Sequence, residues 1–180
     1  MNSKFEITTE RLKLRAYKSD DWERVHIYGS NPDFSKYELW GPNSVDDTHK
    51  FVADMVEQSK SNPRYKFDFA VCMKENDLLI GGCGIRRESE TSNVANLGWA
   101  INPEFQSNGF ATEAARALID FGFKELKLTV IYATCDTRNT QSFKVMEKLG
   151  MKKVGFIKGM KEIKGHVRDS FRYELVRIGY

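Results

Sequence analysis

A short segment that leads into a helix holds the residues with the clearest chemical potential. Residues 106–112 read Gln-Ser-Asn-Gly-Phe-Ala-Thr and open an apolar helical repeat that includes Ala111, Ala114 and Leu118. A helix N-terminus carries unpaired N–H groups and about half a positive charge, so it suits a phosphate or pyrophosphate. Gly109 would let the backbone approach such an anion closely. The spacing therefore predicts an anion site, although an ordinary strand-to-helix loop fits the same spacing.

Other phosphate-binding motifs do not fit this sequence. A P-loop needs Gly-x4-Gly-Lys-Ser/Thr, which is absent. Residues 82–87, Gly-Cys-Gly-Ile-Arg-Arg, lack the third glycine of a dinucleotide fingerprint and fall within strands. The helix starts at Ser19 and Ser44 are followed by acidic residues, which disfavour an anion.

A second candidate pair opens the helix expected over 139–149. Asn139 and Ser142 have the i, i+3 spacing that places two side chains on one side of a helix. Asn139 is also a good N-cap residue, and Gly150 suits the position just after the helix. The Asn139 side chain could therefore cap the helix, contact a ligand, or do both.

The cysteines and histidines indicate no metal site. Cys72, Cys83 and Cys135 are an odd number without metal-type spacing. Each stands among β-branched or small apolar residues, which is typical of a reduced, buried cysteine. The three histidines have no ligand-like spacing either, so we expect no metal.

Charge and hydropathy exclude several classes of protein. The net charge of +3, from 28 basic and 25 acidic residues, is too small for a typical nucleic-acid binder. The lysine-rich stretch 148–164 is expected to be a solvated face of a hairpin. Residues 1–6 lack the apolar stretch of a signal peptide, and no run reaches the roughly 18–20 apolar residues of a membrane span. A cytoplasmic protein without membrane contact is the expectation.

Residues 1–180 are expected to form a single domain, because no repeat, low-complexity stretch or linker interrupts them. Helices are expected to begin at Ser19, Ser44, Gly109 and Asn139, with Ser19 and Ser44 as caps. The expected strands lie at 12–15, 67–73, 78–84, 93–101, 129–135, 154–158 and 167–176.

Two details of these strands matter for a site. Gly81, Gly82 and Gly84 interrupt one strand and predict a bulge or a close backbone contact. Strand 93–101, the helix that follows it and strand 129–135 form a βαβ unit, so the two strands should be parallel. The fold class is therefore α/β with a mixed sheet.

Motifs along nearly the whole chain, in the right order, resemble the GNAT N-acetyltransferase superfamily. Gln106-x-x-Gly109-x-Ala111 resembles its acetyl-CoA pyrophosphate motif. Other motifs resemble its branch of ribosomal-protein N-terminal acetyltransferases (RimJ- and RimL-like): Thr9-Glu10-Arg11-Leu12-x-Leu14-Arg15, Leu79-Ile80-Gly81, Leu97-Gly98-Trp99-x-Ile101-x-Pro103, Asn139-x-x-Ser142-x-x-x-x-Glu147-Lys148-Leu149-Gly150-Met151 and Arg168-Asp169-Ser170. Ala111 stands where many members have glycine, and Met151 where phenylalanine is usual.

The resemblance implies a fold and a cofactor. The fold is a mixed, mostly antiparallel sheet of six or seven strands with about four flanking helices and a splayed pair of parallel strands. The cofactor is acetyl-CoA, used as a co-substrate without a metal. The residues expected to bind it are Gly98, Trp99, Ala100, Ile101, Gln106, Ser107, Asn108, Gly109, Phe110, Ala111, Thr112, Asn139 and Ser142.

The implied reaction is direct transfer, in which an amine attacks the thioester without an acyl-enzyme. Backbone N–H groups near Gly98 and Trp99 would hold the acetyl carbonyl. By resemblance, Asn139 binds the pantetheine arm or the acetyl end, and Ser142 lies near the sulfur as a proton donor. Glu104 is a candidate base; Glu38, Glu162, His166 and a water chain are alternatives. Cys135 has no base nearby in the sequence, which disfavours an acyl-cysteine.

The sequence predicts an N-acetyltransferase whose acceptor is a primary amine of a protein N-terminus or of a small molecule. Amino acids, polyamines and aminoglycoside-like amines all remain open, as do a monomer and a homodimer. Two other functions also remain. The chain could bind acyl-CoA as a sensor without turnover, or act as a ribosome- or RNA-associated module through its lysine-rich hairpin.

Overall fold

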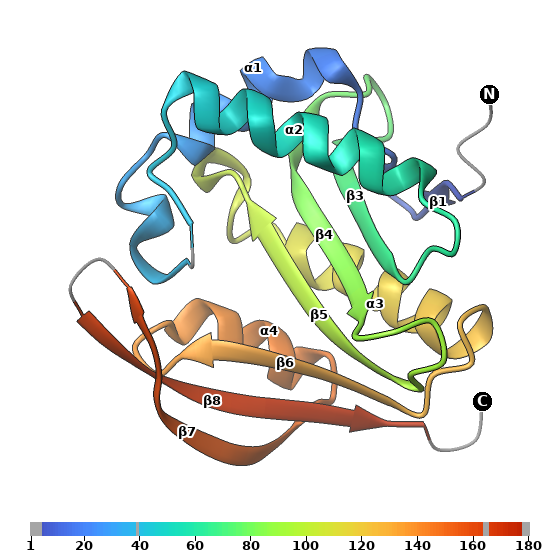
Figure 1. The fold of residues 1–180 in the computed structure, drawn as a ribbon, viewed down its shortest axis with the longest axis vertical. Helices are drawn as coiled ribbons and strands as arrows, with labels where there is room; N and C mark the ends of the chain where they lie inside the picture. The colour runs from blue at the N-terminus through green and yellow to red at the C-terminus, as the bar shows by residue number, and fades with distance from the viewer. Residues whose placement is uncertain (1–4, 39, 164–165, 178–180) are drawn as a thin grey trace.

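The computed structural model describes residues 5–38, 40–163 and 166–177. They form one eight-stranded sheet with the order β1-β2-β3-β4-β5-β6-β8-β7 (Figure 1). The strands are β1 (Ile7–Thr8), β2 (Leu12–Arg15), β3 (Lys66–Met73), β4 (Leu79–Arg87), β5 (Val94–Ile101), β6 (Val130–Asp136), β7 (Lys152–Ile163) and β8 (His166–Val176). The helices are α1 (Trp22–Gly29), α2 (Val45–Lys60), α3 (Phe110–Lys124) and α4 (Thr140–Lys148), with short 3-10 turns η1 (Ser19–Asp21), η2 (Phe34–Tyr37) and η3 (Pro103–Phe105).

This architecture confirms the expected α/β class and mostly antiparallel sheet. Seven strands match the expected ones, and β1 adds an eighth. Strand β1 pairs antiparallel with β2 over two residues only, Ile7 with Leu14 and Thr8 with Lys13. Two residues are too few to show the alternation that identifies a strand in a sequence.

No helix in the described part of the chain is long and apolar enough to cross a membrane.

The sheet splits between β5 and β6, which among the described strands are the parallel neighbours. They pair only from Val94–Val130 to Asn96–Tyr132. Beyond that point β5 stays paired with β4 as far as Ile101, and β6 stays paired with β8 as far as Asp136. The carboxyl ends of β5 and β6 therefore diverge (Figure 1), which confirms the expected splay.

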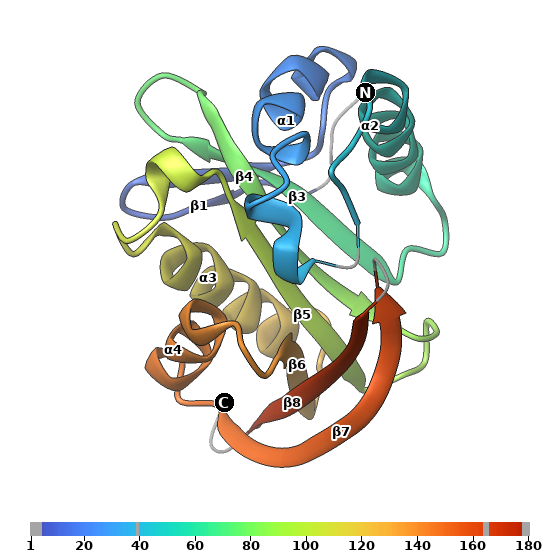
Figure 2. The same ribbon diagram turned by 90° about the vertical axis from the view of Figure 1, so that its left-hand side faces the viewer.

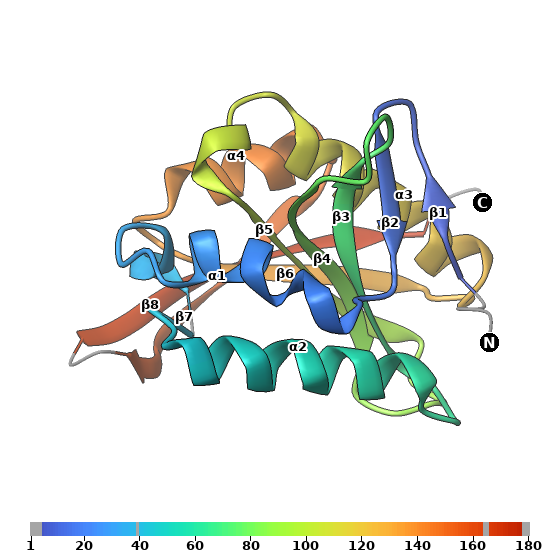
Figure 3. The same cartoon turned by 90° about the horizontal axis from the view of Figure 1, so that it is seen from above.

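Helices cover both faces of the sheet and create two cores. Figures 2 and 3 show α1 and α2 on one face and α3 and α4 on the other. Strand β3 contributes to both, because successive side chains point to opposite faces. Phe67, Phe69 and Val71 belong to the core under α3, whereas Ala70 and Cys72 belong to the core under α1 and α2.

The glycines of β4 mark both features that the sequence predicts. The pairing of β3 with β4 shifts by one residue beside Gly81, so a bulge lies there. A Cβ on Gly84 would overlap the carboxylate of Asp68 on β3. Close approach across this strand pair therefore requires glycine.

The cap expected at Ser44 is confirmed, whereas the cap expected at Ser19 is not found. Ser44 Oγ accepts a hydrogen bond from the Asp47 N–H at 3.1 Å and caps α2. At the first start, Ser19 lies inside η1, and Asp21 stands at the N-cap of α1 without a side-chain capping bond. The Asp21 carboxylate instead accepts a bond from the Lys18 N–H at 2.8 Å. Asp21 is drawn inward because both of its oxygens also bind the buried Arg15 guanidinium, at 2.8 Å each.

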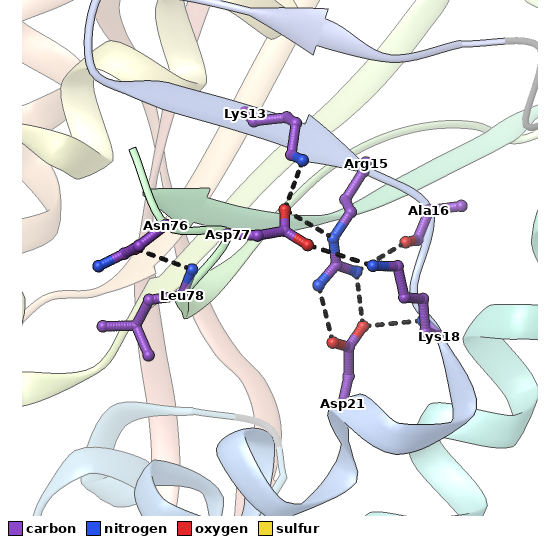
Figure 4. A network of polar contacts seen from close by, with 8 residues as sticks. All are labelled: Lys13, Arg15, Ala16, Lys18, Asp21, Asn76, Asp77 and Leu78. Carbon is purple, nitrogen blue, oxygen red and sulfur yellow. Dashed lines mark hydrogen bonds and ion pairs between the residues drawn. The ribbon is translucent and has the colours of Figure 1, made fainter. Parts of the chain in front are cut away.

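Asp77, in the turn between β3 and β4, extends this pair into the network of Figure 4. It binds Lys13 at 2.6 Å, Lys18 at 3.1 Å and Arg15 at 3.4 Å. Burial alone would raise the pKa of Asp77, but the bonds from the two lysines and the charge of Arg15 lower it to about 2. The network joins β2, the β3–β4 turn and the start of α1.

Replacing Asp21 with alanine should destabilise the protein strongly, because it leaves Arg15 buried without its bidentate partner. We expect a loss of about 3 kcal/mol or more in the free energy of unfolding, measured by urea denaturation. Asp20→Ala, at an exposed neighbour, is the control and should change stability little. Equal losses in the two variants would contradict this role for the Arg15–Asp21 pair.

Candidate active site

A cavity of about 760 Å³ lies beside the diverging ends of β5 and β6. Its walls are the end of β5 at Ala100 and Ile101, the segment 105–112 apart from Asn108, and one side of α4. We call it the larger cavity. Apart from Asn108, residues 106–112, where the sequence predicts an anion site, therefore line this cavity.

The segment before α3 holds its shape through its own side chains. Gln106 Nε2 donates to the Ile101 carbonyl at 2.9 Å, and Asn108 Nδ2 donates to the Gln106 carbonyl at 3.0 Å. Ser107 and Gly109 have φ of 64° and 83°, which turn the chain into the helix. Gln106 thus has a positioning role, because its side-chain amide is engaged by β5.

The first turn of α3 leaves backbone donors facing this cleft. The first α-helical bond runs from the Glu113 N–H to the Gly109 carbonyl at 3.0 Å. The N–H groups of Phe110, Ala111 and Thr112 precede it and therefore have no acceptor inside the helix. All three residues line the larger cavity. The arrangement suits a phosphate, as the sequence predicts.

The N-terminal strands fasten this turn through Glu113. Its Oε1 accepts bonds from Thr9 Oγ1 at 2.6 Å and from the Arg11 N–H at 2.9 Å, and its Oε2 accepts from Arg11 Nε at 2.8 Å. Arg11 also donates to the Asn108 carbonyl at 3.1 Å and lies over the Phe110 ring at 4.5 Å. Burial alone would raise the pKa of Glu113, but these bonds lower it. The sequence offers the motif but no sign of this contact, which spans about a hundred residues.

Asn139 and Ser142 form part of the opposite wall. Asn139 Oδ1 accepts from the Ser142 N–H at 3.1 Å, so the expected capping is confirmed. The Asn139 amide nitrogen and the Ser142 hydroxyl have no hydrogen-bond partner among the described residues. Capping therefore leaves both groups able to meet a ligand.

A smaller cavity of about 360 Å³ lies under α1 and α2. Aromatic side chains line much of it, and Gly98 and Arg86 contribute from the sheet. Six residues line both cavities: Tyr37, Glu38, Trp99, Ala100, Asn139 and Ser142. The two cavities therefore meet at the splay.

Backbone donors at the meeting point follow from strand geometry. The Asn102 N–H bonds to the Ile80 carbonyl on β4 at 2.8 Å. Because N–H groups alternate sides along a strand, we infer that those of Ala100 and Gly98 also face β4. The Trp99 N–H then faces the gap where β6 no longer pairs. Of the two amides expected near the acetyl carbonyl, that of Trp99 is the one directed into the gap.

The candidate bases are dispersed. Glu104 lies in η3, is exposed and lines neither cavity, so it is not brought close to Asn139 and Ser142. Glu38 follows η2 and lines both cavities. The side chains of Glu162 and His166 lie outside the described part of the structure.

Cys135 lines the smaller cavity, but its thiol is expected to be unreactive. Burial raises the pKa of its thiol to about 11, so the thiolate is scarce at neutral pH. Cys72 and Cys83 are buried as well. These positions agree with cysteines that serve as small apolar residues. Among the described residues, no three His, Cys, Asp or Glu side chains gather as metal ligands would.

Comparison with known proteins shows the family to which the chain belongs. The family model for the acetyltransferase (GNAT) domain matches residues 11–152. The uncharacterized N-acetyltransferase YnaD of Bacillus subtilis (strain 168) is 36% identical over 152 residues, which are 84% of this chain and 85% of that protein. The chain belongs to the GNAT acetyltransferase family. It is an N-acetyltransferase by the same evidence.

Solved GNAT structures share the fold over almost the whole chain. An acetyltransferase (GNAT family) from Bacillus anthracis has a TM-score of 0.84 and 34% identity, covering 96% of this chain and 98% of that one. RimL, a ribosomal L7/L12 α-N-protein acetyltransferase solved with coenzyme A, also has a TM-score of 0.84 at 17% identity, covering 96% and 98%. The similarity to RimL supports the fold alone.

Glu113→Gln should destabilise the protein, because it loosens the contact between the first turn of α3 and the N-terminal strands. We expect a loss of about 1.5 kcal/mol in stability, because hydrogen bonds to a charged group disappear. The lowered pKa means that Glu113 stabilises the folded state above its unfolded pKa and less as the pH falls through the folded one. The difference between variant and wild type in urea denaturation should therefore shrink below about pH 4. Glu125→Gln, at an exposed position just past the same helix, is the control; a difference that does not depend on pH would contradict this role.

Proposed function

We propose that this protein transfers an acetyl group from acetyl-CoA directly to a primary amine of a protein N-terminus or small molecule. The observation that carries the proposal is the meeting of two cavities at the splay, with Trp99, Asn139 and Ser142 in both linings. In this reading the larger cavity takes acetyl-CoA and the smaller one takes the amine. The thioester and the amine then meet between β5 and α4.

The larger cavity has suitable groups along the length of the donor. The N–H groups of Phe110, Ala111 and Thr112 bind the pyrophosphate. Lys144 and Lys148 of α4 line the same cavity and supply positive charge for further phosphate oxygens. Backbone groups of β5 that face the gap pair with the amides of the pantetheine arm, as an added strand would.

The chemistry then needs little beyond positioning and hydrogen bonds. The amine lone pair attacks the thioester carbon, a C–N bond forms and the C–S bond breaks. Negative charge on the carbonyl oxygen is stabilised by the Trp99 N–H. The amine gives up a proton to a base. The CoA thiolate takes a proton from Ser142, which regains one from solvent, while Asn139 holds the acetyl end.

Glu38 is the carboxylate best placed to act as the base, directly or through water. It lines both cavities, whereas Glu104 lines neither. A base must lie within hydrogen-bond reach of the proton it takes, or within reach of an intervening water. We therefore assign the base to Glu38 and regard Glu104 as a matched control on the surface.

Substitution of these residues tests the mechanism through thiol release from acetyl-CoA. Glu38→Gln should lower kcat about 100-fold at neutral pH, and Ser142→Ala about 10-fold. The KM for acetyl-CoA should stay nearly unchanged in Glu38→Gln, because the base does not hold the donor. Glu104→Gln should behave as wild type; a large loss in Glu104→Gln with none in Glu38→Gln would reverse the assignment.

A thermal shift with acetyl-CoA, followed by thiol release with a panel of amines, separates the functions open to this chain. The proposal predicts a shift and amine-dependent release. A shift without release for any amine would favour an acyl-CoA sensor. Salt-sensitive binding of nucleic acid with no shift would favour an RNA-associated module, and the absence of a shift would contradict the proposed enzyme.

A further inference from the structure

Arg168 of β8 is a buried cation that the proposed reaction does not use. The residue is 7% exposed and lines the smaller cavity. Its Nε donates to Ser170 Oγ at 3.1 Å, and its Nη1 donates to the Tyr37 carbonyl at 3.3 Å. Both acceptors are neutral. A guanidinium has five N–H donors, so three of them have no acceptor among the described residues.

The charge of Arg168 is also uncompensated within the described part of the chain. No described carboxylate forms an ion pair with it. The other arginine of this cavity, Arg86, is different, because Asp68 binds it through both carboxylate oxygens. The charge of Arg168 contributes to lowering the pKa of Asp136. Both carboxylate oxygens of Asp136, however, accept hydrogen bonds from Arg138, at 2.9 and 2.7 Å. A buried charge without a partner is costly, so an anion that enters the cavity would be favoured.

The shape and lining of the cavity narrow the identity of that anion. A guanidinium fork matches a carboxylate in a planar, bidentate arrangement. Tyr17, Tyr28, Trp40 and Phe51 line the same cavity and offer apolar surface. At about 360 Å³ the cavity suits a small molecule.

We propose that the acceptor is a small amino acid with an apolar or aromatic side chain, whose carboxylate binds Arg168 while its amine faces Trp99 and Ser142. This inference rests on the proposed function and names the class of its substrate. A polyamine fits poorly, because its second ammonium group would enter a cavity that already holds the Arg168 guanidinium, which has no ion-pair partner among the described residues. A peptide N-terminus lacks the carboxylate next to its amine.

Three related amines test the role of the carboxylate. Thiol release from acetyl-CoA is measured with L-phenylalanine, L-phenylalaninamide and phenethylamine, which differ in that group. We expect kcat/KM for phenylalanine to exceed the other two by about 100-fold, as for loss of a charged hydrogen-bonded pair. Spermidine and an N-terminal peptide complete the panel. A preference for either of these over phenylalanine would overturn the proposal.

Variants on β8 then assign the preference to Arg168. Arg168→Gln should lower kcat/KM for phenylalanine about 100-fold and leave phenethylamine within about threefold of wild type. Arg168→Lys keeps the charge and should restore part of the preference. Arg172→Gln, four residues along the strand, paired with Glu174 and in neither cavity, should keep it in full. A preference that survives in Arg168→Gln would overturn the assignment.

A binding measurement separates the failure of this inference from the failure of the proposed reaction. Calorimetry compares 3-phenylpropionate with 3-phenylpropan-1-ol, neither of which has an amine. We expect the carboxylate to bind at least about tenfold more tightly, and Arg168→Gln to abolish the difference. This result without thiol release for any amine would retain the carboxylate site and reject the transfer reaction. Equal binding of the two probes would reject the carboxylate site, whatever the activity.

Discussion

The site depends on the loss of backbone pairing between β5 and β6 after Asn96 and Tyr132. Parallel strands that part leave N–H and C=O groups without partners, and buried groups of this kind must find others. The Ile101 carbonyl accepts a bond from the side chain of Gln106, and the Trp99 N–H faces the gap. The gap persists because β4 and β8 hold the two halves of the sheet in full register.

Residues remote in the sequence fix the position of both walls of this gap. Glu113 ties the start of α3 to Thr9 and Arg11, so the strands at the N-terminus set the orientation of the first turn of α3. On the other side, Arg168 of β8 reaches the carbonyl of Tyr37, and this bond ties η2 to the far half of the sheet. A site built between such elements is more rigid than one built on loops alone.

Local features of the fold and the site could be predicted from the sequence. The glycine at 109 and the cap at Asn139 depend on neighbours within a few residues, and the βαβ order follows from the succession of strand, helix and strand. Long-range contacts could not. Ser19 lies inside η1 and does not cap α1, and the Asp21 carboxylate is bound by Arg15 on another element. Glu104 and Glu38 look alike in the sequence, and only the path of the chain places one at the surface and the other between two cavities.

Electrostatics distinguish the two cavities more sharply than shape does. The larger one gathers N–H donors and the lysines of α4, as a pyrophosphate requires. The smaller one is lined in part by aromatic side chains, and there Asp68 neutralises Arg86 in a strand pair so close that only glycine fits at position 84. Of the two arginines that line this cavity, Arg168 is the one bound only by neutral acceptors among the described residues. Because desolvated charges discriminate strongly among ligands, the acceptor proposal gives this one arginine more influence on which amine is accepted than the aromatic walls around it.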